Sequence, residues 1–165
     1  MNRRVLKLLT LTAVVAGSFA AGGLVTATAQ QDPSGPPPCT LVTPLEAEAT
    51  LGGEVTSNET ESACTHVAVV GHDVRSLTVT APASDATSEA FAEGLQLYAE
   101  EAGVEIRGVP EVGPDAYATL GKDVSQISAL VNGRALTIVA YGLGTSADEQ
   151  TTTLRDLGQK AAGRI

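Results

Sequence analysis

The sequence predicts an α+β domain in which three helices pack on an antiparallel sheet of about five to six strands, with one disulfide. Two patterns predict this class. Apolar residues alternate with a period of two in several short runs and recur with a helical period in three others. Tight turns, rather than helices, separate most of the strand-like runs, which favours hairpins over parallel crossovers. Hydrophobic residues make up 43% of the chain, a globular composition that excludes wholesale disorder.

The first 29 residues have the pattern of a secretory signal peptide. A basic head, an uncharged stretch over residues 8–29 and an A-x-A end follow one another. We expect cleavage between Ala29 and Gln30, and therefore a secreted or extracytoplasmic envelope protein with no membrane span after cleavage. The alternative is an uncleaved anchor, since about 20 apolar residues can cross a bilayer. The basic residues of the head are Arg3, Arg4 and Lys7.

Residues 30–38 form a Pro-rich linker, and we expect a single domain over residues 39–165. Cys39 and Cys64 are the only cysteines, and thiols on the exported side of a membrane tend to oxidise. A disulfide between them would stabilise the fold by about 3–4 kcal/mol. The alternative, a catalytic or metal-binding thiol, lacks a C-x-x-C motif or a Cys/His cluster in the sequence.

The first part of the domain begins with a helix signal. Thr43 and Glu46 have the spacing of a capping box around Pro44, and Gly52 is placed to end the helix. After an acidic, polar stretch, two alternating runs flank a turn. The predicted elements are a helix over 43–51, a loop over 54–63, and antiparallel strands over 64–70 and 74–81 joined by a turn at 71–73.

The second part of the domain contains the clearest hairpin signal. Asn132-Gly133 separates two alternating apolar runs, which is the strongest short-range indication of a hairpin. A helix is predicted by apolar residues that fall on one face, namely Phe91, Leu95, Tyr98 and Ala102. The predicted elements are a helix over 85–102, strands over 104–109, 116–120, 127–131 and 136–140, and a closing helix from Ser146 with Leu154, Leu157, Ala161 and Ile165 on its apolar face.

The domain begins with Pro38-Cys39-Thr40-Leu41-Val42-Thr43-Pro44-Leu45-Glu46, followed by Leu51-Gly52 and by Cys64 at the start of a strand. This pattern resembles small actinobacterial envelope proteins of the domain-of-unknown-function 3558 type, over roughly residues 38–165. Val112–Tyr117 is loosely similar to their Gly-x-Gly-Asp-x-Ala segment, from which it departs at Val112, Pro114 and Tyr117. Many such relatives are lipoproteins, whereas this sequence has no lipidation cysteine. The resemblance implies an extracytoplasmic α+β module with no established reaction.

Charge and composition exclude several classes of partner. The chain has nineteen Asp+Glu against ten Lys+Arg, a net charge of −9, and loss of the basic head would make it more acidic. Nucleic acids and anionic membranes attract basic patches, so neither is an expected partner. Aromatic residues are only 3% of the chain, too few for a stacking platform. Those after the signal segment are expected in the core: Phe91, Tyr98, Tyr117 and Tyr141.

No motif predicts catalysis. His66 and His72, with Asp73, could approach around a turn and bind Zn²⁺ or Cu²⁺, but one exposed strand histidine and one turn histidine is the simpler interpretation. Gly142–Ala147 has the G-x-G-x-x-A spacing of a dinucleotide site, yet it follows a hairpin and precedes only one helix. No G-x-S-x-G motif indicates a serine hydrolase. We therefore expect no enzyme, cofactor or metal.

Three functional hypotheses remain. The favoured one is a non-catalytic binding or sensor-like module for an unknown envelope ligand or protein, with a partly apolar pocket or groove near Tyr98, Tyr117 or Tyr141. The second is a structural or protein-interaction component of the envelope, with no pocket and one broad apolar patch. The least favoured is a His-dependent enzyme or metal-binding protein, with His66 or His72 in a cleft beside an acid.

Overall fold

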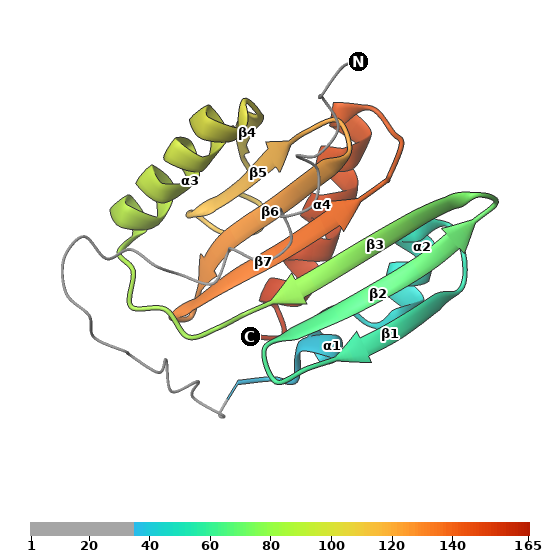
Figure 1. The fold of residues 1–165 in the computed structure, drawn as a ribbon. Coiled ribbons are helices and arrows are strands. Elements are labelled where there is room, and N and C mark those ends of the chain that lie inside the picture. Colours follow the sequence, from blue (N-terminus) through green and yellow to red (C-terminus); the bar gives the residue numbers. More distant parts are fainter. Residues whose placement is uncertain (1–34) are drawn as a thin grey trace, which may run out of the picture. The chain divides into compact units, whose positions relative to one another are not determined.

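A computed structural model describes residues 35–165 of the chain (Figure 1). Residues 1–34, and with them the expected cleavage between Ala29 and Gln30, lie outside this described part. Within the described part, seven antiparallel strands form one sheet in the order β1-β2-β3-β7-β6-β5-β4, accompanied by four helices. The predicted α+β class with an antiparallel sheet is confirmed, with slightly more strands and helices than predicted.

The described part begins with two short helices, followed by three strands, a helix, four strands and a final helix. The helices are α1 (Pro38–Leu41), α2 (Pro44–Leu51), α3 (Ser88–Ala102) and α4 (Ala147–Ala162). The strands are β1 (Val55–Glu59), β2 (Ala63–Val70), β3 (Asp73–Thr80), β4 (Glu105–Gly108), β5 (Ala116–Leu120), β6 (Val124–Val131) and β7 (Arg134–Tyr141).

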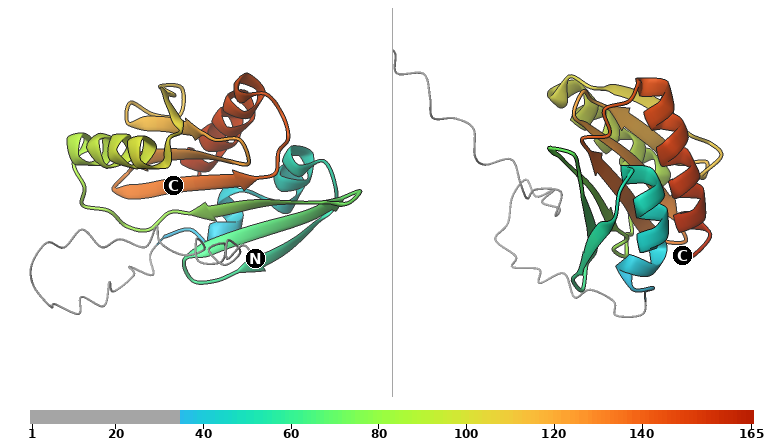
Figure 2. Two further views of the ribbon diagram at one scale, coloured as in Figure 1. Left: turned by 45° about the horizontal axis from the view of Figure 1, so that its top comes forward. Right: turned by 90° about the vertical axis from the view of Figure 1, so that its right-hand side faces the viewer.

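The helices divide between the two faces of the sheet. Helices α1, α2 and α4 pack on one face, and α3 lies on the other, against β4 and β5 (Figure 2, right). On the α3 side, Thr119, Gln126 and Ser128 are buried although their side chains point away from α4. Within the described part, no helix is both long and apolar enough to cross a membrane.

Local sequence signals account for the ends of the helices and for the turns. Thr43 accepts a hydrogen bond from the backbone of Glu46, whose carboxylate accepts one from Thr43 N at 2.9 Å, so the predicted capping box forms. Ser146 and Glu149 repeat this arrangement at the start of α4. At the β6–β7 hairpin, Asn132 (φ 48°) and Gly133 (φ 73°) both adopt the left-handed conformation that a two-residue turn requires.

The main core lies between the sheet and helices α1, α2 and α4. Leu77, Ile138 and Leu154 are among its fully buried residues. Gly158 lets α4 approach the sheet closely, since a Cβ there would lie 3.0 Å from Ile127 Cδ1 and 3.1 Å from Val112 Cγ2. The sheet and these helices therefore pack closely around one core.

Two element predictions were wrong. Residues 54–63 were expected to be a loop but contain β1, which pairs with β2 over its full length. Most of its side chains are exposed, so no apolar alternation marks it in the sequence. Helix α1 was not predicted, because a single turn of four residues has no readable periodicity.

The expectation that the aromatic residues belong to the core was also wrong. Tyr98 is 40% exposed and Tyr141 is 49% exposed, while Phe91 and Tyr117 are only partly buried. Ala102, predicted on the same helical face as Tyr98, is exposed as well. These residues belong to α3 or to the side of the sheet that carries α3, where the covering layer is thin.

Candidate functional site

The sheet has one face that no described helix covers over β1, β2, β3 and β7. Helices α1 and α2 pack against the other face of the first three of these strands, and α4 packs there against β7. Helix α3 covers only the β4–β5 end of the opposite side, as Figure 2 (right) shows. The uncovered part is therefore an open surface. Its residues can be identified because side chains alternate between the two faces of a strand and paired residues on neighbouring strands share a face.

We call this surface the open sheet face. Buried Cys64, His66, Ala68, Leu77 and Val79 point to the core, so the alternate residues point outward. None of the outward residues has a charged side chain. They are Thr56 and Asn58 of β1, Ala63, Thr65, Val67 and Val69 of β2, Val74, Ser76, Thr78 and Thr80 of β3, and Ala135, Thr137, Val139 and Tyr141 of β7, with neighbouring Val124 of β6.

Exposed large apolar side chains of the described residues gather on this side of the sheet. Four belong to the open sheet face: Val69 (67% exposed), Val74 (56%), Tyr141 (49%) and Val124 (42%). Two more, Leu97 and Tyr98, lie on α3, which sits on the same side. Only Leu45 of α2, 74% exposed, lies elsewhere. Interaction surfaces typically show such a concentration, whereas scattered exposed apolar residues are ordinary in soluble domains.

Ion pairs avoid the open sheet face. Those formed by the described residues involve α2, α4 or β4. Hydrogen bonding to Arg164 holds the pKa of Glu46 at about 2. Hydrogen bonding to Arg107 likewise lowers the pKa of the Glu105 carboxyl, and Arg107 also pairs with Asp148 of α4. The ion pairs therefore lie on the side of the sheet that carries α2 and α4 and at the β4 edge.

The three tyrosines predicted to line a pocket come from three different elements on one side of the sheet. Tyr98 lies on α3, and the register places Tyr117 of β5 on the same side as Tyr141 of β7. Two surface pockets of the described part, of about 520 and 450 Å³, are lined by other residues. The larger lies beside Pro37, Glu59 and Arg134, and the smaller at the β1–β2 edge.

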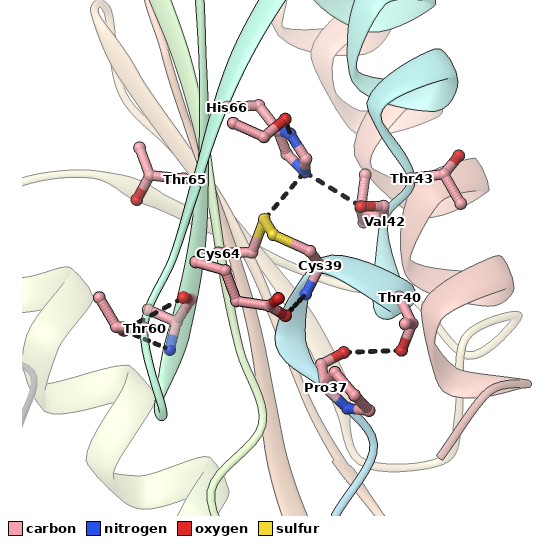
Figure 3. Close-up of a disulfide and its surroundings, with 12 residues drawn as sticks. Pro37, Cys39, Thr40, Val42, Thr43, Thr60, Cys64, Thr65 and His66 are labelled. Carbon is pink, nitrogen blue, oxygen red and sulfur yellow. Dashed lines mark hydrogen bonds between the residues drawn. A yellow bond between two sulfur atoms is a disulfide. The ribbon is translucent and has the colours of Figure 1, made fainter.

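A second cluster surrounds the predicted disulfide, which is confirmed between Cys39 and Cys64 (Figure 3). It joins α1 to β2. Cys64 is fully buried, whereas Cys39 is partly exposed. The backbone N–H of Cys39 donates to Oε1 of Glu59 at 2.9 Å, so a carboxylate lies at the more accessible end of the disulfide.

His66 is fully buried beside this disulfide, contrary to the expectation of an exposed strand histidine. Its Nε2 lies 3.0 Å from the carbonyl oxygen of Val42 and 3.3 Å from Sγ of Cys64, and its Nδ1 lies 2.7 Å from Oγ of Ser57 (Figure 3). A carbonyl only accepts, so the neutral ring carries its proton on Nε2 and accepts from Ser57 at Nδ1. Both nitrogens are therefore engaged.

The suggested grouping of His66 with His72 and Asp73 does not form. His66 faces the core, whereas His72 and Asp73 are exposed at the β2–β3 turn. The sequence contained the signal for the actual cluster, because His66 stands two residues after Cys64 in a strand and so shares its face. Alternation alone does not show which face of β2 is buried; the packing of α1 and α2 against the face that carries Cys64 and His66 makes it the core side.

Comparisons of the chain with protein-family models, with curated proteins and with solved structures found no match. The proposals below are based on the open sheet face and on the cluster of His66 with the Cys39–Cys64 disulfide.

Proposed function

We propose that this chain is an exported, non-catalytic binding module of the cell envelope that holds its ligand or partner on the open sheet face. One observation carries the proposal: the exposed large apolar side chains gather on the side of the sheet where the strand residues are uncharged. Apolar surface gains most from being covered, and the absence of charge removes the desolvation penalty that covering ionised groups would bring. The disulfide and the signal-like N-terminal pattern support an oxidising, extracytoplasmic location.

The composition of the open sheet face indicates the chemistry of what it binds. Valines provide apolar contact, and threonines provide hydroxyls that both donate and accept hydrogen bonds. Thr65 Oγ1 and Thr78 Oγ1 lie 3.2 Å apart on neighbouring strands and form part of this polar array. An uncharged, partly apolar ligand or protein surface that is flat or extended fits such a face. The expected pocket at the tyrosines is replaced in this proposal by surface recognition.

The structural or protein-interaction hypothesis is supported by the same broad apolar patch and differs only in the nature of the occupant. A relationship to the actinobacterial envelope proteins of the domain-of-unknown-function 3558 type is part of the proposal. Its support is that Cys39 and Cys64, which carry the resemblance, form the disulfide.

The test places a photo-crosslinking amino acid at Thr78, in the middle of the open sheet face, in cells that produce the protein. Thr152, exposed on α4, is the matched control position. We expect a discrete adduct from Thr78 and none from Thr152. The mass of the adduct separates the two occupants, since a protein partner adds a polypeptide and a small ligand does not.

A pair of charge insertions makes this test specific. Val74→Lys places a charge on the open sheet face, and Leu45→Lys makes the same kind of change at the exposed apolar residue outside it. Both side chains are more than half exposed, so each change should alter the free energy of unfolding by no more than about 0.5 kcal/mol. We expect Val74→Lys to abolish the Thr78 adduct and Leu45→Lys to leave it intact. Equal adducts from both crosslinking positions, or none from Thr78, would refute the proposal.

A further inference from the structure

We propose that reduction of the Cys39–Cys64 disulfide creates a binding site for a borderline-soft d¹⁰ cation, with Zn²⁺ as the ion it suits. The ligands are Sγ of Cys39, Sγ of Cys64 and Nε2 of His66. This inference is independent of the open sheet face, which lies on the other side of the sheet.

The ligand atoms are already close together. The two sulfurs and a ring nitrogen of His66 all lie within 4.8 Å of one another. Around a tetrahedral Zn²⁺, with Zn–S of about 2.3 Å and Zn–N of about 2.0 Å, neighbouring ligand atoms are about 3.5–3.8 Å apart. Nε2 lies 3.3 Å from Sγ of Cys64, near that spacing. The main movement required is separation of the two sulfurs, which Cys39 can provide because it lies on a single helical turn at the start of the domain.

The chemistry of the donors favours this class of ion. Two thiolates and one imidazole form the Cys₂His set that suits Zn²⁺, and three protein ligands leave a fourth position open for water. Two thiolates neutralise the dication, so the buried site carries no net charge. Glu59, whose carboxylate accepts from Cys39 N, adds negative charge at the accessible end. A surface pocket of about 520 Å³ lies next to the cluster and is lined by Pro38, which precedes Cys39 in the chain, and by Glu59, which accepts from Cys39 N.

Ser57 is placed to orient the imidazole in the metal-bound state. Coordination at Nε2 requires the ring proton to move to Nδ1, which lies 2.7 Å from Oγ of Ser57. The hydroxyl then accepts from Nδ1–H, the outer contact that ligating histidines usually make. The carbonyl of Val42 loses its donor in this state, so the bond from Nε2–H to Val42 favours the oxidised, metal-free form.

The exchange balances with a dithiol as the reductant. The dithiol transfers two electrons and two protons, the Cys39–Cys64 bond breaks to two thiols, and the reductant closes to its own disulfide. Zn²⁺ then displaces both thiol protons, while the imidazole stays neutral by moving its proton from Nε2 to Nδ1. Reoxidation by a disulfide compound reverses the steps and releases the ion.

The test is a cobalt titration of the full chain in its reduced and oxidised forms, with a phosphine used as reductant so that no added thiol competes for the metal. Co²⁺ bound by thiolates has a near-ultraviolet charge-transfer absorption. We expect one equivalent of Co²⁺ to produce this band in the reduced chain only, and Zn²⁺ to abolish it by displacement. Cys39→Ser combined with Cys64→Ser should eliminate the band.

Three further variants test the ligand set. His66→Gln should raise the Co²⁺ dissociation constant at least tenfold, and Ser57→Ala should raise it about tenfold through loss of the orienting contact. The control, His72→Gln, removes the exposed histidine and should leave the dissociation constant unchanged. Cadmium NMR of the reduced wild-type chain counts the sulfur and nitrogen ligands directly and does not depend on whether His66→Gln folds. Absence of the charge-transfer band, a cadmium signal without a nitrogen ligand, or equal effects of His66→Gln and His72→Gln would overturn the proposal.

Discussion

The ion pair between Glu46 and Arg164 should make the stability of the domain strongly dependent on pH in the acid range. Glu46 accepts from both terminal nitrogens of Arg164 at 2.8 Å, and Arg164 also donates to the carbonyl of Leu41. The pair joins the start of α2 to the end of α4, 118 residues apart in the sequence. Glu46→Gln removes the charge but leaves a residue that can still complete the capping box with Thr43.

The magnitude follows from the pKa of Glu46, which is lowered from 4.5 to about 2, chiefly by its hydrogen bond to Arg164. At about 1.4 kcal/mol per pKa unit, this difference of about 2.5 sets an upper limit of about 3.5 kcal/mol on the stabilisation. Glu46 is 16% exposed and Arg164 is 34% exposed, so solvent screening reduces the effect. We expect Glu46→Gln to lower the free energy of unfolding by about 1–2 kcal/mol at pH 7.

The pKa of Glu46 is depressed in the folded state, so its contribution is fully present above the unfolded-state pKa and is lost as the pH falls from about 4.5 towards 2. Urea unfolding of the wild type and Glu46→Gln at a series of pH values measures this directly. The free energies of unfolding of wild type and Glu46→Gln should differ at pH 7 and converge near pH 2. Glu48→Gln removes a charge from the same helix and is the control. Its free energy of unfolding should change with pH in the same way as that of the wild type. A constant difference between wild type and Glu46→Gln across this range, or zero coupling in a double-mutant cycle with Arg164→Met, would refute the reasoning.

Three further predictions concern the core and the disulfide. Replacing both Cys39 and Cys64 by serine should lower the free energy of unfolding by about 3–4 kcal/mol in urea melts, and a loss below about 1 kcal/mol would contradict a stabilising bridge. Leu154→Ala removes a fully buried side chain of α4 and should cost about 2–5 kcal/mol in thermal or urea unfolding, whereas a loss under about 1 kcal/mol would mean that α4 is not firmly packed. Gly158→Val should cost about 1–3 kcal/mol because its Cβ would crowd the sheet, while Thr152→Val, at an exposed position on the same helix, should cost far less; equal effects would refute the close-approach argument.

Those parts of the fold that depend on local chemistry were predictable from the sequence. The capping boxes at Thr43 and Ser146 and the turn at Asn132-Gly133 each use residue types whose side chains or backbone freedom satisfy one local geometry. The disulfide was predictable because the chain has only two cysteines. Neighbours in the chain decide the caps and the turn, whereas the disulfide, which joins residues 25 apart, was predictable only because no other pairing exists.

Strand β1 could not be predicted, because its stability comes from its partner. Its polar residues gain backbone hydrogen bonds by pairing with β2, and their side chains remain in solvent. The burial of His66 had the same kind of cause. Alternation placed His66 on one side of β2, but only the packing of α1 and α2 against that side shows that it is the buried one.

The open sheet face could not be predicted because it exists only where no described helix packs on one side of strands that are distant in the sequence. Its valines and threonines come from separate hairpins, and each strand alone has the ordinary alternation of a half-buried sheet. The prediction for Tyr98, Tyr117 and Tyr141 assumed that they would line a pocket, whereas they come from three elements and the two pockets described above are lined by other residues.

The distribution of charge explains how an acidic chain can keep such a face exposed. A flat apolar sheet surface beside an edge strand normally risks association with other copies of itself. Here threonines lie among the valines of the face, and Glu54 precedes and Glu59 ends the polar edge strand β1. Copies that carry a net charge of −9 also repel one another at long range. These features disfavour self-association while leaving the face available to a partner that supplies matching apolar and hydroxyl groups. The same argument favours a distinct ligand or partner over a second copy of the chain as the occupant of the open sheet face.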